Sequence, residues 1–437
     1  MENRRVVVTG IGLVSAGGMT GDAVHEFLIS GRSAVTTTEA LGEIPIPYYA
    51  PITAFTGKIE DFGELPADVM KPIRKGLKLM CRETQMGVSA AQRAMADAGW
   101  TAGLVEPDRI GVSYGCDHLV SDTADFNGAV HACLAALGSE GRETEVDCRT
   151  WGEYGIPRIS PLWLLLYLPN MPASHVAIYN DLRGPSNSVM LREVSAVASI
   201  GEASAAIRRG RAEMMLAGAT GTRLHPVRLV HFAQQETMAA RGLAPESACR
   251  PFDIERTGTL PGEGAACLVL EDYEHARRRG VAIHAEILAT DTAAAYHAPS
   301  HPNRAMALRL ALRRAMGRSG VTLAELGCCV AYGTGTPIGD AEEAAVLAEM
   351  LGDAVPVTAM KDRWGNAGCG GGMIELAAGI MAMQRREIPA IRNCALPDPA
   401  IRLDLVRENR PMPGDAIVAV SMNAQGQAGA IVARRME

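Results

Sequence analysis

Residues 249–280 of the chain read CRPFDIERTGTLPGEGAACLVLEDYEHARRRG, and the pattern within this stretch indicates the fold class. Residues 265–270 form a continuous apolar run, which is typical of a strand that is buried on both of its faces. Comparable runs recur along the chain and alternate with segments of helical spacing. This alternation predicts an α/β protein with largely buried sheets.

The same patterns predict the elements on either side of this stretch. We expect strands at residues 5–9, 109–113, 212–217, 328–332, 416–421 and 428–433. We expect helices at residues 22–29, 83–99, 193–209, 303–316, 340–351 and 372–383. Gly10-Ile11-Gly12 is expected to form a turn after the first strand, and Asp22 is expected to cap the first helix.

Two segments fit the alternation poorly. Residues 138–158 are polar and mixed, and we expect a surface excursion there, either a passive insertion or a lid. Residues 368–372 read GCGGG, which indicates a close approach of two backbones or a turn with positive φ.

The composition excludes several classes of protein. With 437 residues, of which 48% are hydrophobic and 21% charged, the chain can form one large or two ordinary globular domains. A net charge of −7 and an aromatic content of 4% argue against nucleic-acid binding. The longest apolar run, residues 162–168, is too short to span a membrane. No signal peptide is recognisable at the N-terminus, so we expect a cytoplasmic protein.

The ten cysteines follow no regular spacing. They include no C-x-x-C pair, so the sequence predicts neither a zinc site nor a disulfide framework, and no metal is expected. We expect the cysteines to be reduced and to serve as small buried apolar residues. Gly10-x-Gly12 is a weak match to a dinucleotide-binding turn, because Ser15 stands at the third glycine position.

Four segments in a fixed order indicate a protein family. They are residues 4–15 (RRVVVTGIGLVS), 182–188 (LRGPSNS), the stretch 249–280 and residues 331–343 (AYGTGTPIGDAEE). Together they resemble the β-ketoacyl carrier-protein synthases of fatty-acid and type II polyketide synthesis. The resemblance implies the thiolase fold, a five-layered αβαβα arrangement of two similar halves, which here would be residues 1–250 and 251–437. It also implies a dimer that acts on acyl chains carried by the phosphopantetheine of acyl carrier protein, with no other cofactor.

The chain departs from the family at the catalytic positions. The family's nucleophilic cysteine lies at a helix start, nine residues after the glycine of G-P-S, and the same count from Gly184 reaches Glu193. The two active-site histidines of the family correspond to Tyr332 and Asn366. Condensation needs a thiolate that holds the acyl chain and two imidazoles that stabilise an enolate. We therefore expect no independent condensation, and we do not expect Cys369, which stands at a glycine position of the family, to replace the nucleophile.

Other positions of the family are retained. Thr334 and Thr336 match positions that bond the phosphopantetheine arm, although threonines also suit a simple turn. The supporting positions that persist are Lys361, Glu375, Glu263, Asp340 and His297. In the family's glycine-rich C-terminal gate, Ala424 stands where the resemblance implies a phenylalanine.

Two roles for Glu193 are open from the sequence. Its carboxylate could cap the helix, pair with Arg192 or Lys361, and fill the volume that a loaded acyl chain needs. Alternatively, Glu193, Tyr332 and Asn366 could form a new acid–base set for proton transfer, cyclisation or hydrolysis of a bound acyl chain.

The resemblance and its altered catalytic positions lead to a preferred function and an alternative. The preferred function is a non-condensing subunit that resembles the chain-length factor of type II polyketide, polyene or fatty-acid systems and shapes the acyl tunnel of an active ketosynthase. Its partners would be that ketosynthase, in a heterodimer, or a second copy of itself, together with acyl carrier protein. The alternative is an enzyme with altered chemistry on a carrier-protein thioester that uses Glu193 as a general base. A scaffold protein outside acyl chemistry is disfavoured, because Thr334 and Thr336 remain.

Overall fold

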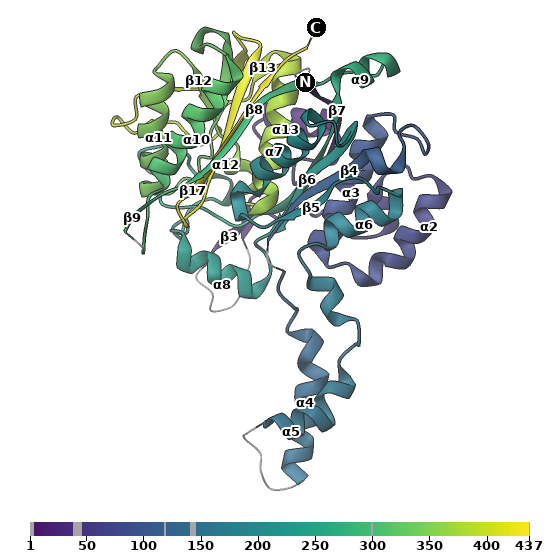
Figure 1. The fold of residues 1–437 in the computed structure, drawn as a ribbon. Helices are drawn as coiled ribbons and strands as arrows, with labels where there is room; N and C mark the ends of the chain where they lie inside the picture. The colour runs from purple at the N-terminus through teal and green to yellow at the C-terminus, as the bar shows by residue number, and fades with distance from the viewer. Residues whose placement is uncertain (1–3, 38–45, 118, 140–145, 299, 437) are drawn as a thin grey trace.

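The structure is a computed structural model that describes residues 4–37, 46–117, 119–139, 146–298 and 300–436. In these ranges eleven strands join in one mixed sheet (Figure 1). From one edge to the other, the strands are β14 (Asp404–Leu405), β12 (Pro356–Thr358), β11 (Leu326–Val330), β16 (Ala416–Met422), β17 (Gln427–Arg434), β8 (Ala285–Ala294), β1 (Val6–Val14), β7 (Glu263–Asp272), β6 (Met214–Thr222), β4 (Ile110–Cys116) and β5 (Ser186–Val189).

The sheet consists of two halves with the same order of strand pairing. In the first half, β1 pairs antiparallel with β7 and β7 with β6, and then β6, β4 and β5 run parallel. In the second half, β8 pairs antiparallel with β17 and β17 with β16, and then β16, β11, β12 and β14 run parallel. The halves join where β1 meets β8, through the pairs Val7 with Glu286 and Val8 with Ala285.

Helices complete five layers. α3 (Arg82–Asp97) packs against β1, β7 and β6 of the first half, and α10 (Arg304–Ser319) packs against β8 and β17 of the second. Between the halves lie α7 (Ser195–Arg208) and α13 (Cys369–Arg385), which contact each other and strands of both halves. The resulting order of helix, sheet, helix, sheet and helix is that of the thiolase fold (Figure 1).

The remaining elements connect these layers. The other helices of the body are α1 (Gly21–Ile29), α2 (Ala67–Gly76), α6 (Met171–Asn180), α8 (Pro226–Gln235), α9 (Tyr273–Arg279), α11 (Pro337–Leu351) and α12 (Lys361–Trp364). Short strand pairs are β2 (Thr36–Thr37) with β3 (Tyr48–Tyr49), β9 (Tyr296–Ala298) with β10 (His301–Pro302), and β13 (Glu387–Ile388) with β15 (Arg410–Pro411). No helix in the described ranges is long and apolar enough to cross a membrane. The division of the chain into residues 1–250 and 251–437 stays a prediction. β7 follows residue 251 in the sequence but pairs with β1 and β6 of the first half of the sheet.

Two glycines of β1 show why the turn expected there is wrong. The strand runs through Gly10, Ile11 and Gly12, with a shift of register just before Gly10. A Cβ atom at Gly10 would lie 2.2 Å from the carbonyl oxygen of Ala94, and one at Gly12 would lie 1.9 Å from that of Ala90. The glycines therefore serve the close packing of α3 on the strand and not a turn.

Two helix starts also differ from those that the sequence predicts. Thr20, and not Asp22, caps α1, because its hydroxyl accepts a hydrogen bond from the backbone nitrogen of Ala23 at 3.3 Å. The helix expected from residue 193 begins at Ser195 and follows a 3₁₀ turn at Arg192–Val194. This turn places residue 193 at the N-terminal end of α7.

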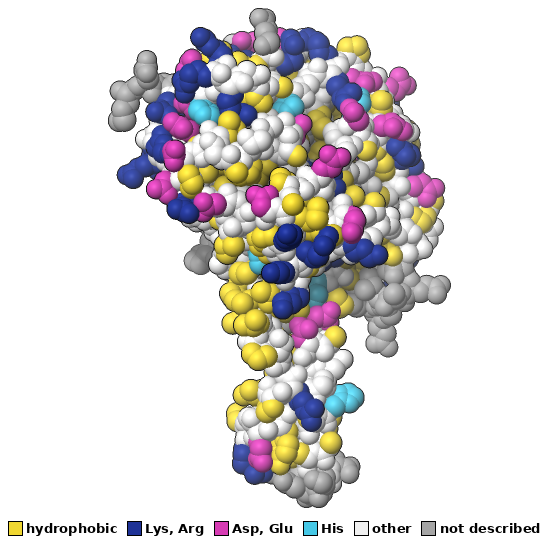
Figure 2. Space-filling view, turned by 90° about the vertical axis from the view of Figure 1, so that its right-hand side faces the viewer, with side chains coloured by type: hydrophobic (Ala, Val, Ile, Leu, Met, Phe, Trp, Pro, Cys, Tyr) yellow, Lys and Arg dark blue, Asp and Glu magenta, His cyan; other side chains and the backbone are white. Residues whose placement is uncertain are grey.

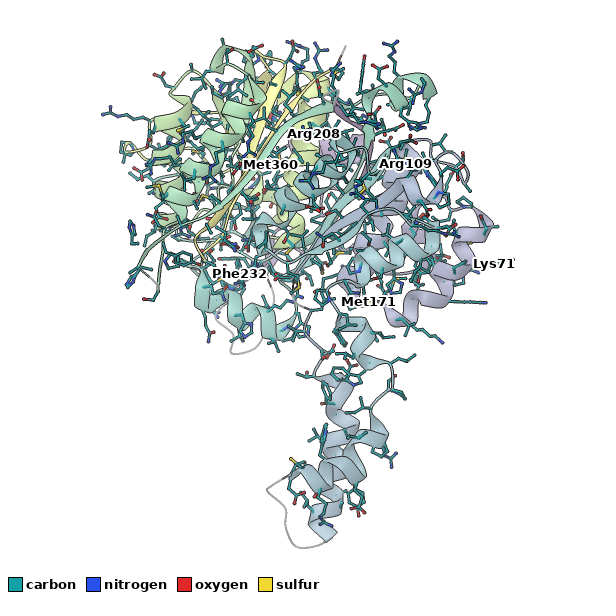
Figure 3. All side chains as sticks on the ribbon, in the orientation of Figure 1. Lys71, Arg109, Met171, Arg208, Phe232 and Met360 are labelled. Carbon is teal, nitrogen blue, oxygen red and sulfur yellow. The ribbon has the colours of Figure 1, made fainter. Side chains whose placement is uncertain are left out.

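The excursion expected at residues 138–158 is part of a longer helical arm, which we define as residues 124–139 and 146–160. It contains α4 (Ala124–Ser139), α5 (Cys148–Thr150) and a π-helical turn at Trp151–Gly155, and it extends away from the body (Figure 1). Residues 140–145 of the expected excursion lie outside the described residues. A neck, residues 161–169, leads from the arm back to α6, whose first residue, Met171, is labelled in Figure 3.

The arm and the neck hold each other by side-chain contacts. The rings of Phe126 and Trp163 pack edge to face with centroids 5.2 Å apart, and the Tyr167 hydroxyl donates to Asp125 Oδ2 at 2.6 Å. The arm therefore begins earlier in the chain than the polar composition of residues 138–158 suggests.

Candidate functional site

The three positions that the resemblance relates to catalytic residues meet between the two halves. Glu193 lies just before α7, Tyr332 follows β11, and Asn366 follows α12. Asn366 Nδ2 donates a hydrogen bond to the Tyr332 hydroxyl at 3.1 Å. Burial raises the pKa of Tyr332 well above its ordinary value, and the nearby Glu193 carboxylate raises it further. The structure thus brings all three side chains into one buried cluster.

Glu193 forms an ion pair with Arg223, and its expected pairing with Arg192 or Lys361 is wrong. Glu193 Oε1 accepts a hydrogen bond from Arg223 Nη2, and Arg223 Nη1 lies 3.3 Å from Asp117 Oδ2. The exposed fractions of these side chains are 8% for Glu193, 3% for Arg223 and 5% for Asp117. A buried arginine therefore lies between two buried carboxylates.

Parallel strands bring this ion cluster together from distant parts of the sequence. Asp117 directly follows β4, and Arg223 directly follows β6. β4 and β6 are parallel neighbours, so their carboxyl ends place the two side chains beside each other. Burial alone would lower the pKa of Arg223, but the carboxylates of Glu193 and Asp117 outweigh burial and raise it. Arg223 is therefore a cation in this site.

Arg223 is also enclosed by an aromatic ring and by backbone. Its guanidinium carbon lies 5.3 Å from the centroid of Phe232 on α8, which is labelled in Figure 3. Its Nε has no hydrogen-bond partner among the described residues, and a Cβ atom at Gly368 would approach this nitrogen to 3.0 Å. The sequence analysis missed Arg223 and Asp117. The signal that points to them is their place directly after two apolar strands, where α/β sheets carry their sites.

Lys361 forms a second buried ion pair beneath Tyr332. Its Nζ lies 2.6 and 2.8 Å from the two carboxylate oxygens of Glu375, and it donates to the carbonyl oxygen of Tyr332 at 2.6 Å. The same nitrogen lies 3.9 Å from the centroid of the Tyr332 ring. Lys361 and Glu375 therefore position Tyr332.

Thr334 and Thr336 order the loop between β11 and α11. Their hydroxyl oxygens lie 2.9 Å apart, and both residues are buried. The Asp340 carboxylate accepts hydrogen bonds from the backbone nitrogens of Thr334, at 2.9 Å, and Gly335, at 3.1 Å. The contact of these threonines with a phosphopantetheine arm stays a prediction.

Glu236 lies beside the cluster and was missed by the sequence analysis. It follows α8, and its Oε2 lies 4.0 Å from Arg304 Nη1. Burial raises the pKa of Glu236 to about 7, and Arg304 offsets this effect only in part. No motif pointed to this residue, because its pKa depends on burial and on charges distant in the sequence.

Two supporting positions lie outside the cluster. The Glu263 carboxylate accepts hydrogen bonds from Arg82 at 2.6 and 2.7 Å and from the backbone nitrogen of Ile52 at 3.0 Å, all within the first half. His297 is exposed on β9, where its Nδ1 lies 3.4 Å from Asn303 Nδ2. Glu263 thus stabilises contacts within the first half, and His297 lies at the surface.

The predicted gate position is close to the cluster. Ala424 lies in the turn between β16 and β17 and is partly buried. The side chain of the neighbouring Asn423 donates to the carbonyl oxygen of Leu191 at 3.4 Å, just before the turn that carries Glu193. The methyl group of Ala424 stands where the resemblance implies a bulky ring.

A thiol lies near the site but in an unreactive state. Cys369 is the first residue of α13, and its Sγ lies 3.5 Å from Ser195 Oγ. Burial raises its pKa well above the ordinary value, so the thiol stays protonated. All ten cysteines are free, eight of them buried, with Cys81 half-buried and Cys148 exposed. The expectation that the cysteines are buried is wrong for Cys148, because this residue lies on the arm.

The three side chains of the cluster are a carboxylate, a phenol and an amide. The Glu193 carboxylate is engaged with Arg223, and the raised pKa of Tyr332 keeps its phenol neutral. Asn366 supplies an amide but no cationic donor. Among the described residues, no three His, Cys, Asp or Glu side chains are grouped so that they could hold a metal ion. The arrangement can fix charges and donate hydrogen bonds, but it provides neither a thiolate nor imidazoles.

Family models match nearly the whole chain. Residues 3–276 match the model described as "Beta-ketoacyl synthase, N-terminal domain", and residues 284–395 match "Beta-ketoacyl synthase, C-terminal domain". The chain is 30% identical to the granaticin polyketide putative beta-ketoacyl synthase 1 of Streptomyces violaceoruber, with 99% of each chain covered. It is 29% identical to the 3-oxoacyl-[acyl-carrier-protein] synthase 2 of Vibrio cholerae, with 93% of this chain and 92% of that protein covered.

Solved structures show the same fold. A beta-ketoacyl synthase from Burkholderia phymatum superposes with a TM-score of 0.82 at 27% identity, covering 99% of this chain and 100% of that one. The ishigamide ketosynthase/chain length factor superposes with a TM-score of 0.80 at 22% identity, covering 100% of both chains.

Proposed function

The chain belongs to the β-ketoacyl synthase family, and on that basis we propose that it is a non-condensing member that serves an active ketosynthase as a partner subunit of the chain-length-factor type. In this role it pairs with the ketosynthase and contributes to the end of the tunnel that holds the growing acyl chain. The acyl group is carried by the phosphopantetheine of acyl carrier protein. The protein itself needs no cofactor of its own.

The single observation that carries this proposal is the ion pair at the nucleophile position. An acyl-enzyme requires a free thiolate with space beside it for the acyl chain. In this chain, Glu193 stands at that position and its carboxylate is bound to the buried Arg223, which is held in turn by Asp117. The same pair leaves Glu193 poorly placed to act as a general base, because its carboxylate oxygen Oε1 already accepts a hydrogen bond from Arg223. The site is closed by charge, whereas the family framework around it persists.

The neck and the neighbouring sheet edge support a partner subunit. The neck reads PLWLLLYLP, yet none of its nine residues is buried, and Leu162 and Leu164 are 49% and 51% exposed. Figure 2 shows hydrophobic side chains gathered where the arm leaves the body. The neck adjoins β5, the edge strand of the large sheet, because Ser188 Oγ donates to the carbonyl oxygen of Pro169 at 3.0 Å. An exposed apolar segment beside an open sheet edge is suited to pairing with another subunit.

The relatives support the class of partner. A curated relative with 99% coverage is a polyketide ketoacyl synthase, and a structural neighbour is the ishigamide ketosynthase/chain length factor. A second neighbour, with a TM-score of 0.81 at 24% identity, is a type II polyketide-synthase ketosynthase in complex with its acyl-carrier protein. An intact ketosynthase and a carrier protein are therefore the partners that we propose.

Co-expression tests this function. The chain is produced with a ketosynthase that has an intact Cys-His-His set and with its carrier protein, and complexes are isolated by a tag on this chain alone. We expect a one-to-one complex that makes product, whereas this chain with carrier protein and malonyl and acyl donors makes none. A stable homodimer that binds no ketosynthase, or product formed by this chain alone in mass spectra, would overturn the proposal.

A further inference from the structure

Arg223 has the geometry of a carboxylate receptor that is already occupied. Its two terminal nitrogens face two different carboxylates, with Nη2 on Glu193 and Nη1 at 3.3 Å from Asp117. Arg223 and Asp117 follow β6 and β4, so both rest on the central sheet. Glu193 comes from the short 3₁₀ turn before α7. The arginine that binds the carboxylate thus follows a strand of the sheet, whereas the bound carboxylate comes from a connecting turn.

The surroundings of Arg223 restrict what can occupy the place of the Glu193 carboxylate. The ring of Phe232 covers one face of the guanidinium, and a Cβ atom at Gly368 would approach its Nε to 3.0 Å. The remaining edge accepts a small planar anion, because a carboxylate matches the spacing of guanidinium hydrogen-bond donors. A neutral amide of the same shape leaves a buried cation with less compensation.

We propose that the space beside Arg223 is a binding site for short aliphatic carboxylates, and that in the resting chain the side chain of Glu193 is its ligand. Replacing Glu193 by alanine removes a carboxymethyl group, which has the size and charge of acetate. In the vacated site Arg223 loses the Glu193 carboxylate but keeps its ion pair with Asp117 and its contact with the ring of Phe232. The proposal concerns the chain by itself and does not depend on a partner subunit.

Acetate tests the proposal directly. Purified full-length Glu193→Ala is unfolded thermally at pH 7.5 in increasing sodium acetate, with sodium chloride added to keep the ionic strength constant. We expect saturable stabilisation with a Kd of about 1 mM, on the order possible for a ligand of four heavy atoms. At 100 mM acetate the midpoint should rise by about 3–5 °C. The unmodified chain should show no acetate-specific rise, because its own glutamate fills the site.

Matched controls separate a receptor from a salt effect. Acetamide, which has the shape of acetate without its charge, should not raise the midpoint of Glu193→Ala. Glu193→Gln keeps the volume filled and should not respond to acetate. Adding Arg223→Met to Glu193→Ala should abolish the response. Equal shifts with acetate and acetamide, or a response that survives Arg223→Met, overturn the proposal.

A refolding experiment covers the case in which Glu193→Ala is isolated unfolded. The variant is refolded from urea in acetate or in acetamide, and the yield of folded monomer or dimer is measured by size-exclusion chromatography. A several-fold higher yield in acetate supports the receptor, and equal yields overturn it.

Discussion

At the scale of single residues, Glu193 and Arg223 form a buried ion pair at the position where the resemblance implies a nucleophile. A buried ion pair gains little net stability, because desolvation of both charges offsets their attraction. Removing one partner, however, leaves the other charge uncompensated and costs about 3–5 kcal/mol. Arg223 also pairs with Asp117, so replacement of Glu193 leaves the arginine one carboxylate, whereas replacement of Arg223 leaves two buried carboxylates without it. We therefore expect replacement of Arg223 to destabilise the fold more than replacement of Glu193.

A thiol placed at position 193 is expected not to restore condensation. In Glu193→Cys, Tyr332 and Asn366 still stand at the positions where the resemblance implies two imidazoles. We expect no β-ketoacyl product from acyl and malonyl carrier protein, as measured by mass spectrometry of the carrier protein. The free energy of unfolding should fall by about 3 kcal/mol, because Arg223 loses a partner and keeps Asp117. Condensation by this single variant would contradict our account of the site.

Glu236 makes the stability of the fold depend on pH. Burial raises its pKa from 4.5 to about 7, so between these values the folded chain binds more protons than the unfolded chain. The stabilisation by the protonated carboxyl is fully present below pH 4.5 and is lost as the pH rises through 7. A shift of this size corresponds to roughly 3 kcal/mol.

Glu236→Gln is expected to remove this contribution. The amide cannot ionise, so at pH 8 the variant should be more stable than the unmodified chain by up to about 3 kcal/mol, whereas at pH 4.5 the difference should vanish. Urea unfolding at pH 4.5, 6 and 8 measures the effect. Glu202→Gln, at an exposed position of α7, is the control and should leave the pH profile unchanged. Parallel profiles for Glu236→Gln and the unmodified chain would refute the assignment.

At the scale of elements, the start of α13 depends on one close approach of two backbones. A Cβ atom at Gly370 would lie 2.0 Å from the carbonyl oxygen of Gly264 in β7, whereas one at Gly371 would come no closer than 4.0 Å to Ala367. Gly370→Ala should therefore displace α13 and lower the free energy of unfolding by about 3 kcal/mol or more. Gly371→Ala should be neutral or slightly stabilising, because alanine favours a helix.

Thermal unfolding of the two glycine variants checks this difference. Equal unfolding midpoints for Gly370→Ala and Gly371→Ala would show that α13 can move away from β7 without loss of stability. The GCGGG segment was expected to mark such an approach or a turn with positive φ, and both occur, since Gly368 has a φ of 59°.

The apolar patterns predicted the long elements because burial determines those patterns. The segments expected at residues 83–99 and 303–316 correspond to α3 and α10 with shifted ends. Gly10 and Gly12 misled the prediction, because a glycine that admits a neighbouring helix looks the same in sequence as one that forms a turn. The thiolase arrangement came from the four matching segments and not from the patterns alone.

The site could be predicted only where it depends on spacing along the chain. Glu193, Tyr332 and Asn366 were located by counting within motifs, and the structure places them together. The partner of Glu193 could not be identified in this way, because Arg223 follows β6 and meets Glu193 only through the packing of α7 on that strand. Arg192 and Lys361 were nearer in sequence or in motif, yet neither pairs with Glu193.

At the scale of the whole molecule, we expect the neck to contribute to binding of the ketosynthase. Leu162→Asp with Leu164→Asp places two charges in the apolar neck and should weaken binding of the ketosynthase at least tenfold, because charged groups would have to be desolvated in the interface. The stability of the isolated chain should change little, since both side chains are about half exposed. Binding is measured by isothermal titration calorimetry.

Leucines of similar exposure elsewhere provide the control for the neck. Leu323 and Leu396 are 43% and 61% exposed and lie in the second half, away from the neck. Leu323→Asp with Leu396→Asp should bind the ketosynthase like the unmodified chain. Equal weakening by both pairs would mean that the neck has no special part in assembly.

The exposed thiol on the arm gives this molecule a built-in attachment point for a fluorescent dye. Cys148 is exposed, eight cysteines are buried, and burial raises the pKa of the half-buried Cys81 to about 12, which leaves almost no thiolate there at neutral pH. A maleimide dye should therefore label Cys148 first, without any engineering of the chain. The emission of that dye would report, in real time, whether the arm is surrounded by water or by another protein.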